Sequence, residues 1–351
     1  MELLTELSLT TQTAYAQLLD AAISAAHMRT AADVTGSFAG KTVRGKKYWY
    51  FQYTEPTGLL RQVYVGPDND AVRSLIEQSR QPSRFAQLGP LARSAAALGC
   101  AQVLPRHLRV IQRLSEYGFF KAGGVLVGTH AFLAYGNMLG VRWGDASRAQ
   151  DVDFAHSEKS LAIALPGNFT LNSDAAIKSL QMGLLPVSGL TSKAGATYLN
   201  PKEPDFRLDF LTTLHRGGEE PFMYPHLGVM LQPLKFMEFL LIDVQQGVLI
   251  AGDKAVVVSI PHPSRYALHK LIVYGERTGS FSVKSNKDLH QAESLLARLL
   301  ETRAWEIDEA WEDLKGRGKG WTDRIKRGRD ALAKVTHNSA VKQWLASSKI
   351  D

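Results

Sequence analysis

Three aspartates in strand-like segments carry the chemistry that this sequence indicates. Asp151 and Asp153 stand in Asp-Val-Asp-Phe, and Asp209 stands in Phe-Arg-Leu-Asp-Phe. Successive side chains of a strand point to opposite faces, so Asp151 and Asp153 share one face while their apolar neighbours face a core. Carboxylates held this close repel each other unless a divalent cation lies between them. The pattern predicts a Mg²⁺ site, with two ions expected and Mn²⁺ as the alternative metal, which suits an in-line displacement at phosphorus.

A glycine turn precedes the paired acids. Val125–Val127 is expected to form a short buried strand and 129–138 a helix, so Gly128 would lie at the strand-to-helix turn, followed by Thr129. Backbone N–H groups at a helix start are unpaired, and a residue without Cβ lets a phosphate approach them. Each feature alone is more often a plain tight turn or a solvated strand edge. In this order they predict a triphosphate site.

These motifs resemble those of the polymerase-beta-like nucleotidyltransferase superfamily. In that family a glycine heads a helix, Asp-x-Asp follows on the next strand, and a third Asp comes from a later strand. The resemblance implies that Gly128 and Thr129 hold the triphosphate. It also implies that the metal-binding and catalytic acids are Asp151, Asp153 and Asp209, the last of which assists as general base.

A second motif lies further along the chain, where Lys270 and Arg277 precede a Lys287-Asp288 pair. It resembles the helical Lys and Lys-Asp motifs of bacterial abortive-infection and type IV toxin nucleotidyltransferases. At helical spacing Lys270 and Arg277 face the same phosphate region. The resemblance implies that Lys270 contacts the triphosphate and that Asp288 holds Lys270 or a metal-bound water, with Lys287 more exposed. The alternative is a surface helix with ordinary salt bridges.

Two basic segments indicate an acidic partner, in keeping with a net charge of +7 and a pI near 9.3. Lys46 and Lys47 precede an aromatic, β-prone run whose hairpin can lie along a nucleic acid and stack its bases, or can pack its rings on neighbouring helices. The second segment is glycine-rich and contains Arg324, Lys326 and Arg327. It is expected to be a mobile loop that binds RNA such as tRNA through phosphates, or a solvated connection between helices.

The resemblance implies a Mg²⁺-dependent nucleotidyltransferase that moves a nucleoside monophosphate from an NTP substrate to an acceptor hydroxyl and releases pyrophosphate. The expected acceptor is an RNA 3′ end or a protein hydroxyl. Two alternatives stay open: a non-catalytic nucleotide or nucleic-acid binding regulatory module, and a small-molecule nucleotidyltransferase. The sequence does not choose among roles in toxicity, defence, repair and housekeeping.

The expected fold is α+β, with a nucleotidyltransferase-type mixed sheet flanked by helices. An N-terminal helical region with a basic aromatic β-hairpin is expected over 1–100, the catalytic core over 101–228 and a mostly helical C-terminal domain over 229–351. The long spacing between Thr129 and Asp151 calls for an additional helix or loop over 136–150. Other expected elements are strands near 151–155, 161–165, 185–189, 196–199 and 206–213, helices over 9–32, 70–80, 84–98, 105–117, 173–182 (capped by Ser173) and 233–245, and a hairpin over 248–260.

Composition places the chain among globular enzymes, with 351 residues, 45% hydrophobic and 21% charged. The single cysteine, Cys100, lies in an alanine-rich stretch and is expected to be a small buried residue rather than a catalytic thiol. There is no apolar run near 18 residues and no charged-then-apolar leader. A cytoplasmic protein without membrane insertion is therefore expected.

Overall fold

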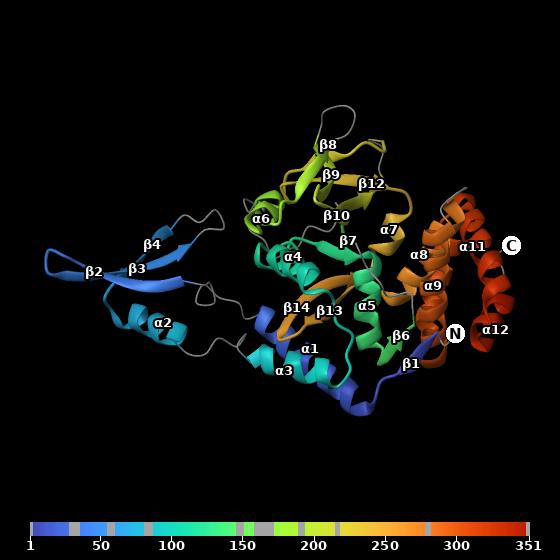
Figure 1. The fold of residues 1–351 in the computed structure, drawn as a ribbon, viewed down its shortest axis with the longest axis horizontal. Coiled ribbons are helices and arrows are strands. Elements are labelled where there is room, and N and C mark those ends of the chain that lie inside the picture. Colours follow the sequence, from blue (N-terminus) through green and yellow to red (C-terminus); the bar gives the residue numbers. More distant parts are fainter. Residues whose placement is uncertain are drawn as a thin grey trace.

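The computed structural model describes residues 3–27, 36–54, 60–80, 87–144, 151–157, 172–188, 194–214, 218–277 and 282–348. The strands are β1 (Leu4–Glu6), β2 (Gly36–Val43), β3 (Lys46–Thr54), β4 (Leu60–Pro67), β5 (Gly124–Val127), β6 (Val141–Trp143), β7 (Val152–His156), β8 (Leu185–Ser188), β9 (Ala194–Asn200), β10 (Glu203–Thr213), β11 (Phe222–Tyr224), β12 (Val229–Leu234), β13 (Val244–Ala251) and β14 (Lys254–Pro261). The helices are α1 (Leu9–His27), α2 (Asp70–Arg80), α3 (Leu88–Ala97), α4 (Pro105–Glu116), α5 (Gly128–Met138), α6 (Ser173–Ser179), α7 (Met237–Leu240), α8 (Pro263–Glu276), α9 (Ser282–Thr302), α10 (Ala304–Lys315), α11 (Lys319–Val335) and α12 (Ser339–Ser347). They form the expected α+β fold, with a mostly helical C-terminal part (Figure 1).

A mixed sheet at the centre holds the strands that carry the motifs. Its order is β11-β12-β10-β7-β5, with β9 paired to the first half of β10 and β8 paired to β9. β10 runs parallel to β7 and β12, whereas β5 runs antiparallel to β7. β10 has the alternating apolar pattern of a strand. Phe206, Leu208 and Phe210 are buried on one side of the sheet, and the residues between them face the other side. The sheet thus places β5, β7 and β10 side by side.

The helices α1 and α3 pack against a β-hairpin formed by β13 and β14. Leu18 of α1, Ala92 of α3 and Ile250 of β13 are fully buried in one cluster. The hydroxyl of Tyr15 lies 3.1 Å from the backbone N of Val248 and 3.3 Å from its carbonyl oxygen. Segments far apart in sequence therefore share one core, and the boundaries expected at residues 100 and 228 stay a prediction.

A separate three-stranded sheet, β2-β3-β4, follows α1 in the chain and precedes α2, which lies against it (Figure 1). The aromatic run expected to form a hairpin is the middle strand, with antiparallel partners on both sides. β2 and β3 join through a two-residue turn, Arg44-Gly45, in which both residues have positive φ (48° and 77°). This is the geometry that a tight hairpin needs.

Two expected elements are wrong. Residues 233–245 do not form one helix, because β12 continues to Leu234, α7 makes a single turn, and β13 begins at Val244. The expected mobile loop around residues 315–329 is largely the first half of α11, which begins at Lys319.

Smaller differences concern the catalytic core. α6 is capped by Asn172 rather than Ser173, since the Asn172 side chain accepts the backbone N–H of Ala175 at 2.8 Å. The inserted segment after the glycine turn contains the rest of α5 and then β6, which pairs with β1. The strand expected at 161–165 lies outside the described residues. Cys100 is buried, as expected, and burial raises the pKa of its thiol to about 11. In the described ranges, no helix has both the length and the apolar character to cross a membrane.

Two helices of the C-terminal part, α8 and α11, cross so closely that glycine is required at the contact. A Cβ on Gly328 would overlap the carbonyl oxygen of Leu271, and a Cβ on Gly275 would overlap that of Arg324. Backbone atoms cannot move aside as the end of a flexible side chain can.

We expect Gly328→Ala to lower the free energy of unfolding by about 1–3 kcal/mol, because the added methyl group forces the helices apart. Gly320→Ala is the matched control on the same helix, since its Cβ would meet nothing nearer than Nη1 of Arg324 at 3.8 Å. Urea unfolding of both variants measures the difference. Equal midpoints for the two variants would contradict the close crossing.

Candidate active site

Asp153 and Asp209 lie next to each other on one face of the central sheet. β7 and β10 are parallel, and Asp153 is in register with Asp209. Asp151 comes two residues before Asp153 and therefore lies on the same face. On the opposite face, the rings of Phe154 and Phe210 are fully buried and stack with centroids 5.2 Å apart. The predicted division into an acidic face and a core face is confirmed.

Two side chains from β9 and β10 form hydrogen bonds with the acids. Thr197 of β9 is in register with Asp209 and donates its hydroxyl to Oδ1 at 2.5 Å. Arg207 of β10 donates Nη2 to Oδ2 of Asp151 at 3.3 Å. The hydrogen bond with Asp151, and then the charges of all three acids, raise the pKa of the Arg207 guanidinium. The acidic face therefore contains its own cation.

Sequence reasoning assigned no role to Arg207, although it is part of the Phe-Arg-Leu-Asp-Phe motif. Its spacing from Asp209 could have indicated a role, because residues 207 and 209 lie on the same face of any strand. Thr197 carried no such signal, since its place beside Asp209 depends on the register between β9 and β10.

Gly128 forms the expected turn between β5 and α5. Its φ is +63°, and a Cβ there would overlap Oδ2 of Asp153. The helix cap residue, Val127, offers no side chain to the N–H groups at the start of α5. Such a helix start presents donors and a positive dipole end. The turn and the acid are thus in direct contact, with Thr129 next in the chain.

Tyr266 of α8 connects this turn to the C-terminal helices. Its hydroxyl lies 2.8 Å from the carbonyl oxygen of Gly128 and 3.1 Å from Oε1 of Gln291 on α9. The side chain is fully buried, and burial raises its pKa, so the phenol stays protonated at neutral pH. One hydroxyl therefore links the first residue of α5 to α8 and α9.

Asp288 of α9 gathers two of the predicted phosphate-binding cations. The carboxylate is buried, accepts a hydrogen bond from Nζ of Lys270 at 2.8 Å and pairs through its other oxygen with Arg277. Lys270 also lies over the ring of Tyr266, 5.2 Å from its centroid. The structure thus brings Lys270, Arg277 and Asp288 together beside the residue that contacts the glycine turn.

Lys287 is half-buried and Asp288 is buried, so Lys287 is the more exposed member of the pair, as expected. Burial and then the neighbouring Lys270 lower the pKa of its ammonium group, whereas Asp153, Asp288 and Asp151 act in the opposite direction. Lys287 therefore lies within electrostatic reach of both the acids and the Lys270 cluster. Position in the sequence gave no sign of this, because it depends on how α9 packs.

Two buried histidines lie behind the acidic face. Nδ1 of His107 on α4 is 2.9 Å from Nε2 of His130 on α5, and the ring of His107 stacks on Phe206. Burial lowers the pKa of His107 to about 4 and that of His130 to about 3. His156, the other histidine near the acids in sequence, is buried with Nε2 2.9 Å from the carbonyl oxygen of Ala122. These side chains are packed and neutral at pH 7.

The donor set on the acidic face suits Mg²⁺, a hard cation that prefers oxygen. Neighbouring carboxylates in register, Asp153 and Asp209, share the face with Asp151. No group of three His, Cys, Asp or Glu side chains among the described residues surrounds a single point closely enough to hold a metal ion by itself. Mg²⁺ commonly takes one or two carboxylates and completes its shell with substrate phosphates and water.

The remaining predicted residues lie on other elements. Lys46 and Lys47 belong to β3 of the small sheet. Arg324, on α11, donates Nε to Glu276 at 2.6 Å, whereas Lys326 and Arg327 are exposed on the same helix.

A family model described as Nucleotidyltransferase matches residues 106–315, more than half of the chain. No curated protein matches the sequence. Among solved structures, an antigenic nucleotidyltransferase-like protein from Paracoccidioides brasiliensis is 16% identical, with a TM-score of 0.31, and the match covers 65% of this chain and 95% of that one.

The histidine pair makes stability depend on pH. In the unfolded chain an imidazole binds its proton near pH 6.5, whereas His107 and His130 stay neutral in the fold down to about 4 and about 3. Below pH 6.5 the unfolded state therefore binds more protons, and each imidazole lowers the free energy of unfolding by about 1.4 kcal/mol per pH unit.

We expect His130→Asn to flatten the fall in stability between pH 6.5 and about 4 by close to one proton's slope. His337→Asn, a change at an exposed histidine, is the control and should leave the slope unchanged. Urea unfolding across this pH range provides the measurement. A slope equal to that of the unaltered protein would show that His130 titrates normally in the fold.

Proposed function

Because the chain belongs to the nucleotidyltransferase family, we propose that it moves a nucleoside monophosphate from an NTP to an acceptor hydroxyl and releases pyrophosphate. The observation that carries this proposal is the contact of the glycine turn with Asp153, beside Asp209 in register. It places an anion-binding helix start next to paired carboxylates, which are the two parts that a metal-bound triphosphate requires. Catalysis would rest on positioning and charge neutralisation.

Asp151, Asp153 and Asp209 would hold Mg²⁺, with Mn²⁺ as the alternative metal. When bound, the metal neutralises the triphosphate and the charge that develops on the leaving oxygen. The new bond joins the acceptor oxygen to the α-phosphorus, the bond to the bridging oxygen breaks, and pyrophosphate leaves. Asp209, oriented by Thr197, would receive the proton of the acceptor hydroxyl.

The cationic groups would hold the phosphates. Gly128 and Thr129 supply backbone donors at the start of α5, while Lys270 and Arg277 are fixed by Asp288. We add Lys287 to this set, because it lies within reach of Asp153 and of Lys270.

An RNA 3′ end is our preferred acceptor over a protein hydroxyl, because the chain has a net charge of +7 and a basic β-sheet outside the catalytic core. The toxin-like subfamily stays a prediction of the Lys270 and Asp288 motif. A regulatory module that binds NTP without turnover, or a transferase acting on a small molecule, would give different results in the assay below.

The first test incubates the protein with each labelled NTP and Mg²⁺ in the presence of total RNA, cell protein or no added acceptor. Transfer of label is expected to RNA, and Asp153→Asn should reduce its rate at least about 100-fold. Asp205→Asn is the matched control, an exposed aspartate on the strand that carries Asp209. NTP binding without transfer in every combination would instead identify a regulatory module, and transfer without a macromolecule would indicate a small-molecule acceptor.

Lys287→Ala is expected to raise KM for the NTP about 10- to 100-fold, because a charge-assisted contact to the triphosphate is lost. Lys326→Ala removes an exposed lysine on α11 and should leave KM unchanged. Steady-state kinetics with varied NTP measure both, and Lys287→Arg should restore part of the affinity. A normal KM in Lys287→Ala would place this lysine outside the substrate site.

A further inference from the structure

The small sheet β2-β3-β4 has two faces of different character. Side chains alternate along β3, so Lys46, Tyr48 and Tyr50 point to one side and Lys47 and Trp49 to the other. The indole N–H of Trp49 donates to Asp68 at 2.9 Å, in the segment that leads into α2. Figure 1 shows α2 lying across one face of the sheet. The Trp49 side is thus the side that packs within this small unit.

The other side carries three tyrosines in mutual contact. Tyr64 of β4 is in register with Tyr50, and their ring centroids are 5.6 Å apart. Tyr48 lies 6.2 Å from the same ring. Tyr64 is 54% exposed, although a ring of this size buries well when an element covers it. These three side chains form what we call the tyrosine face.

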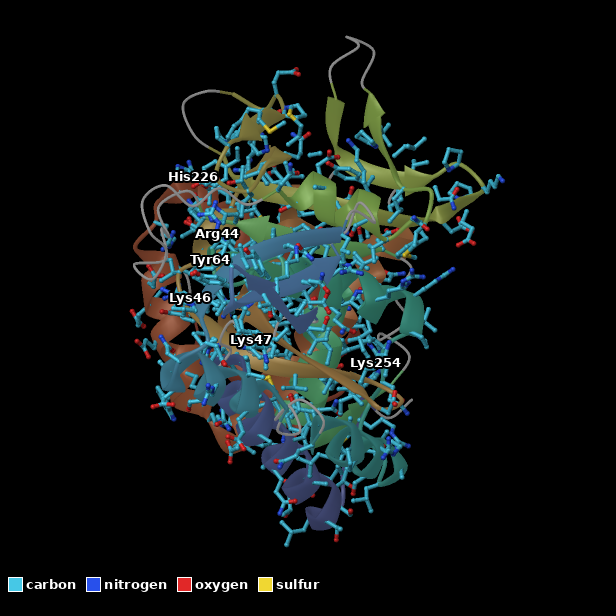
Figure 2. The ribbon with its side chains drawn as sticks, turned by 90° about the vertical axis from the view of Figure 1, so that its left-hand side faces the viewer. Arg44, Lys46, Lys47, Tyr64, His226 and Lys254 are labelled. Carbon is cyan, nitrogen blue, oxygen red and sulfur yellow. The ribbon has the colours of Figure 1, made fainter. Side chains whose placement is uncertain are left out.

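Positive charge borders the tyrosine face. Nζ of Lys41 on β2 lies 4.8 Å from the centroid of Tyr50 and donates to Oε1 of Gln62 at 2.8 Å. Lys46 shares a face with Tyr48 on β3, and Arg44 lies in the turn just before it; Figure 2 labels both residues and Tyr64 on the small sheet. Residues 36–67 contain five Lys or Arg and a single acid. A polyanion is the partner that this charge favours.

We propose that the tyrosine face binds single-stranded RNA, with bases stacked on Tyr48, Tyr50 and Tyr64 and phosphates held by Lys41, Arg44 and Lys46. Tyr64 is exposed and Tyr48 and Tyr50 are half-buried. Accessible rings on a sheet bordered by cations suit unpaired bases, whereas bases within a duplex are already stacked. The phenol hydroxyls and the Gln62 amide supply polar groups for 2′-hydroxyls and base edges, which favours RNA over DNA.

This proposal deepens the one above by naming a surface for the RNA acceptor, but RNA binding itself requires no nucleotidyl transfer. It differs from the expectation based on sequence, which paired Lys46 with Lys47 as RNA contacts. Lys47 points to the other face, with Nζ 4.3 Å from the centroid of the Trp49 ring. Lys46 is the lysine of this pair that belongs to the RNA site.

The test measures fluorescence anisotropy of a labelled single-stranded RNA oligomer with the full-length protein, without NTP and over a range of salt concentrations. Tyr64→Ala should weaken binding about tenfold, because one stacked base is lost, whereas Tyr64→Phe should bind nearly as the unaltered protein. Val63→Ala is the matched control, a neighbouring side chain that is 50% exposed and points to the opposite face.

The charge arm compares Lys46→Gln with Lys47→Gln, which remove the same charge from opposite faces. Lys46→Gln should reduce the slope of log affinity against log salt by about 0.7, the value for one phosphate contact on a single strand. Lys47→Gln should leave the slope unchanged. Equal effects of the two changes, or of Tyr64→Ala and Val63→Ala, would overturn the assignment of the face.

Two further outcomes separate this proposal from the proposed function. Asp153→Asn should keep full RNA affinity, so failure of transfer leaves the binding result intact. Loss of the stacking effect with transfer retained would refute the tyrosine face alone. Equal affinity for a DNA oligomer of the same sequence would overturn the choice of RNA.

Discussion

The main chain at Gly128 is the point on which the site depends. Asp153 occupies the space that any side chain at this position would need, and the positive φ suits glycine. On the other side, the carbonyl group accepts a hydrogen bond from Tyr266. Three elements, β7, α5 and α8, therefore meet at one backbone position. The approach of the acids to the helix start and the placement of the Lys270 cluster both follow from that contact, because each is carried by an element that Gly128 joins.

The second constraint is that the negative charges of the acids must be balanced by nearby cations, because both lie close together and are partly or fully buried. Asp288 keeps only 5% of its side chain exposed and pairs with two cations. A buried carboxylate without them would carry a desolvation cost of several kcal/mol. Arg207 has the corresponding task on the acidic face, where it pairs with Asp151. The chain therefore holds its catalytic candidates in place through pairs that already exist in the protein, and a substrate's charges would add to this arrangement rather than create it.

Features that repeat locally could be predicted from the sequence, and features that depend on packing could not. Period-two alternation was enough to place Asp153 and Asp209 opposite a core, and Gly128 marked its own turn. Short apolar stretches fit a strand as well as a helix. In the segment 233–245 the first two residues pair with β10 and the last two pair with β14, which leaves room for a single helical turn between them. The glycines around 315–329 suggested a loop, but Gly328 serves a close contact between helices. Arg207 and Lys287 were missed because their neighbours come from strand register and from the packing of α9.

One short turn fixes which side chains lie on each face of the small sheet. A shift of one residue in the pairing of β2 with β3 would exchange the faces, turning Tyr48 and Tyr50 toward α2 and Trp49 toward solvent. The Arg44-Gly45 turn prevents this shift, because a two-residue turn with positive φ at both positions fixes Val43 opposite Lys46. Arg44 accepts an unfavourable backbone conformation there, which a non-glycine residue adopts only when its surroundings require it. The register, and with it the placement of Trp49 and the three tyrosines on opposite faces, is therefore set at the Arg44-Gly45 turn.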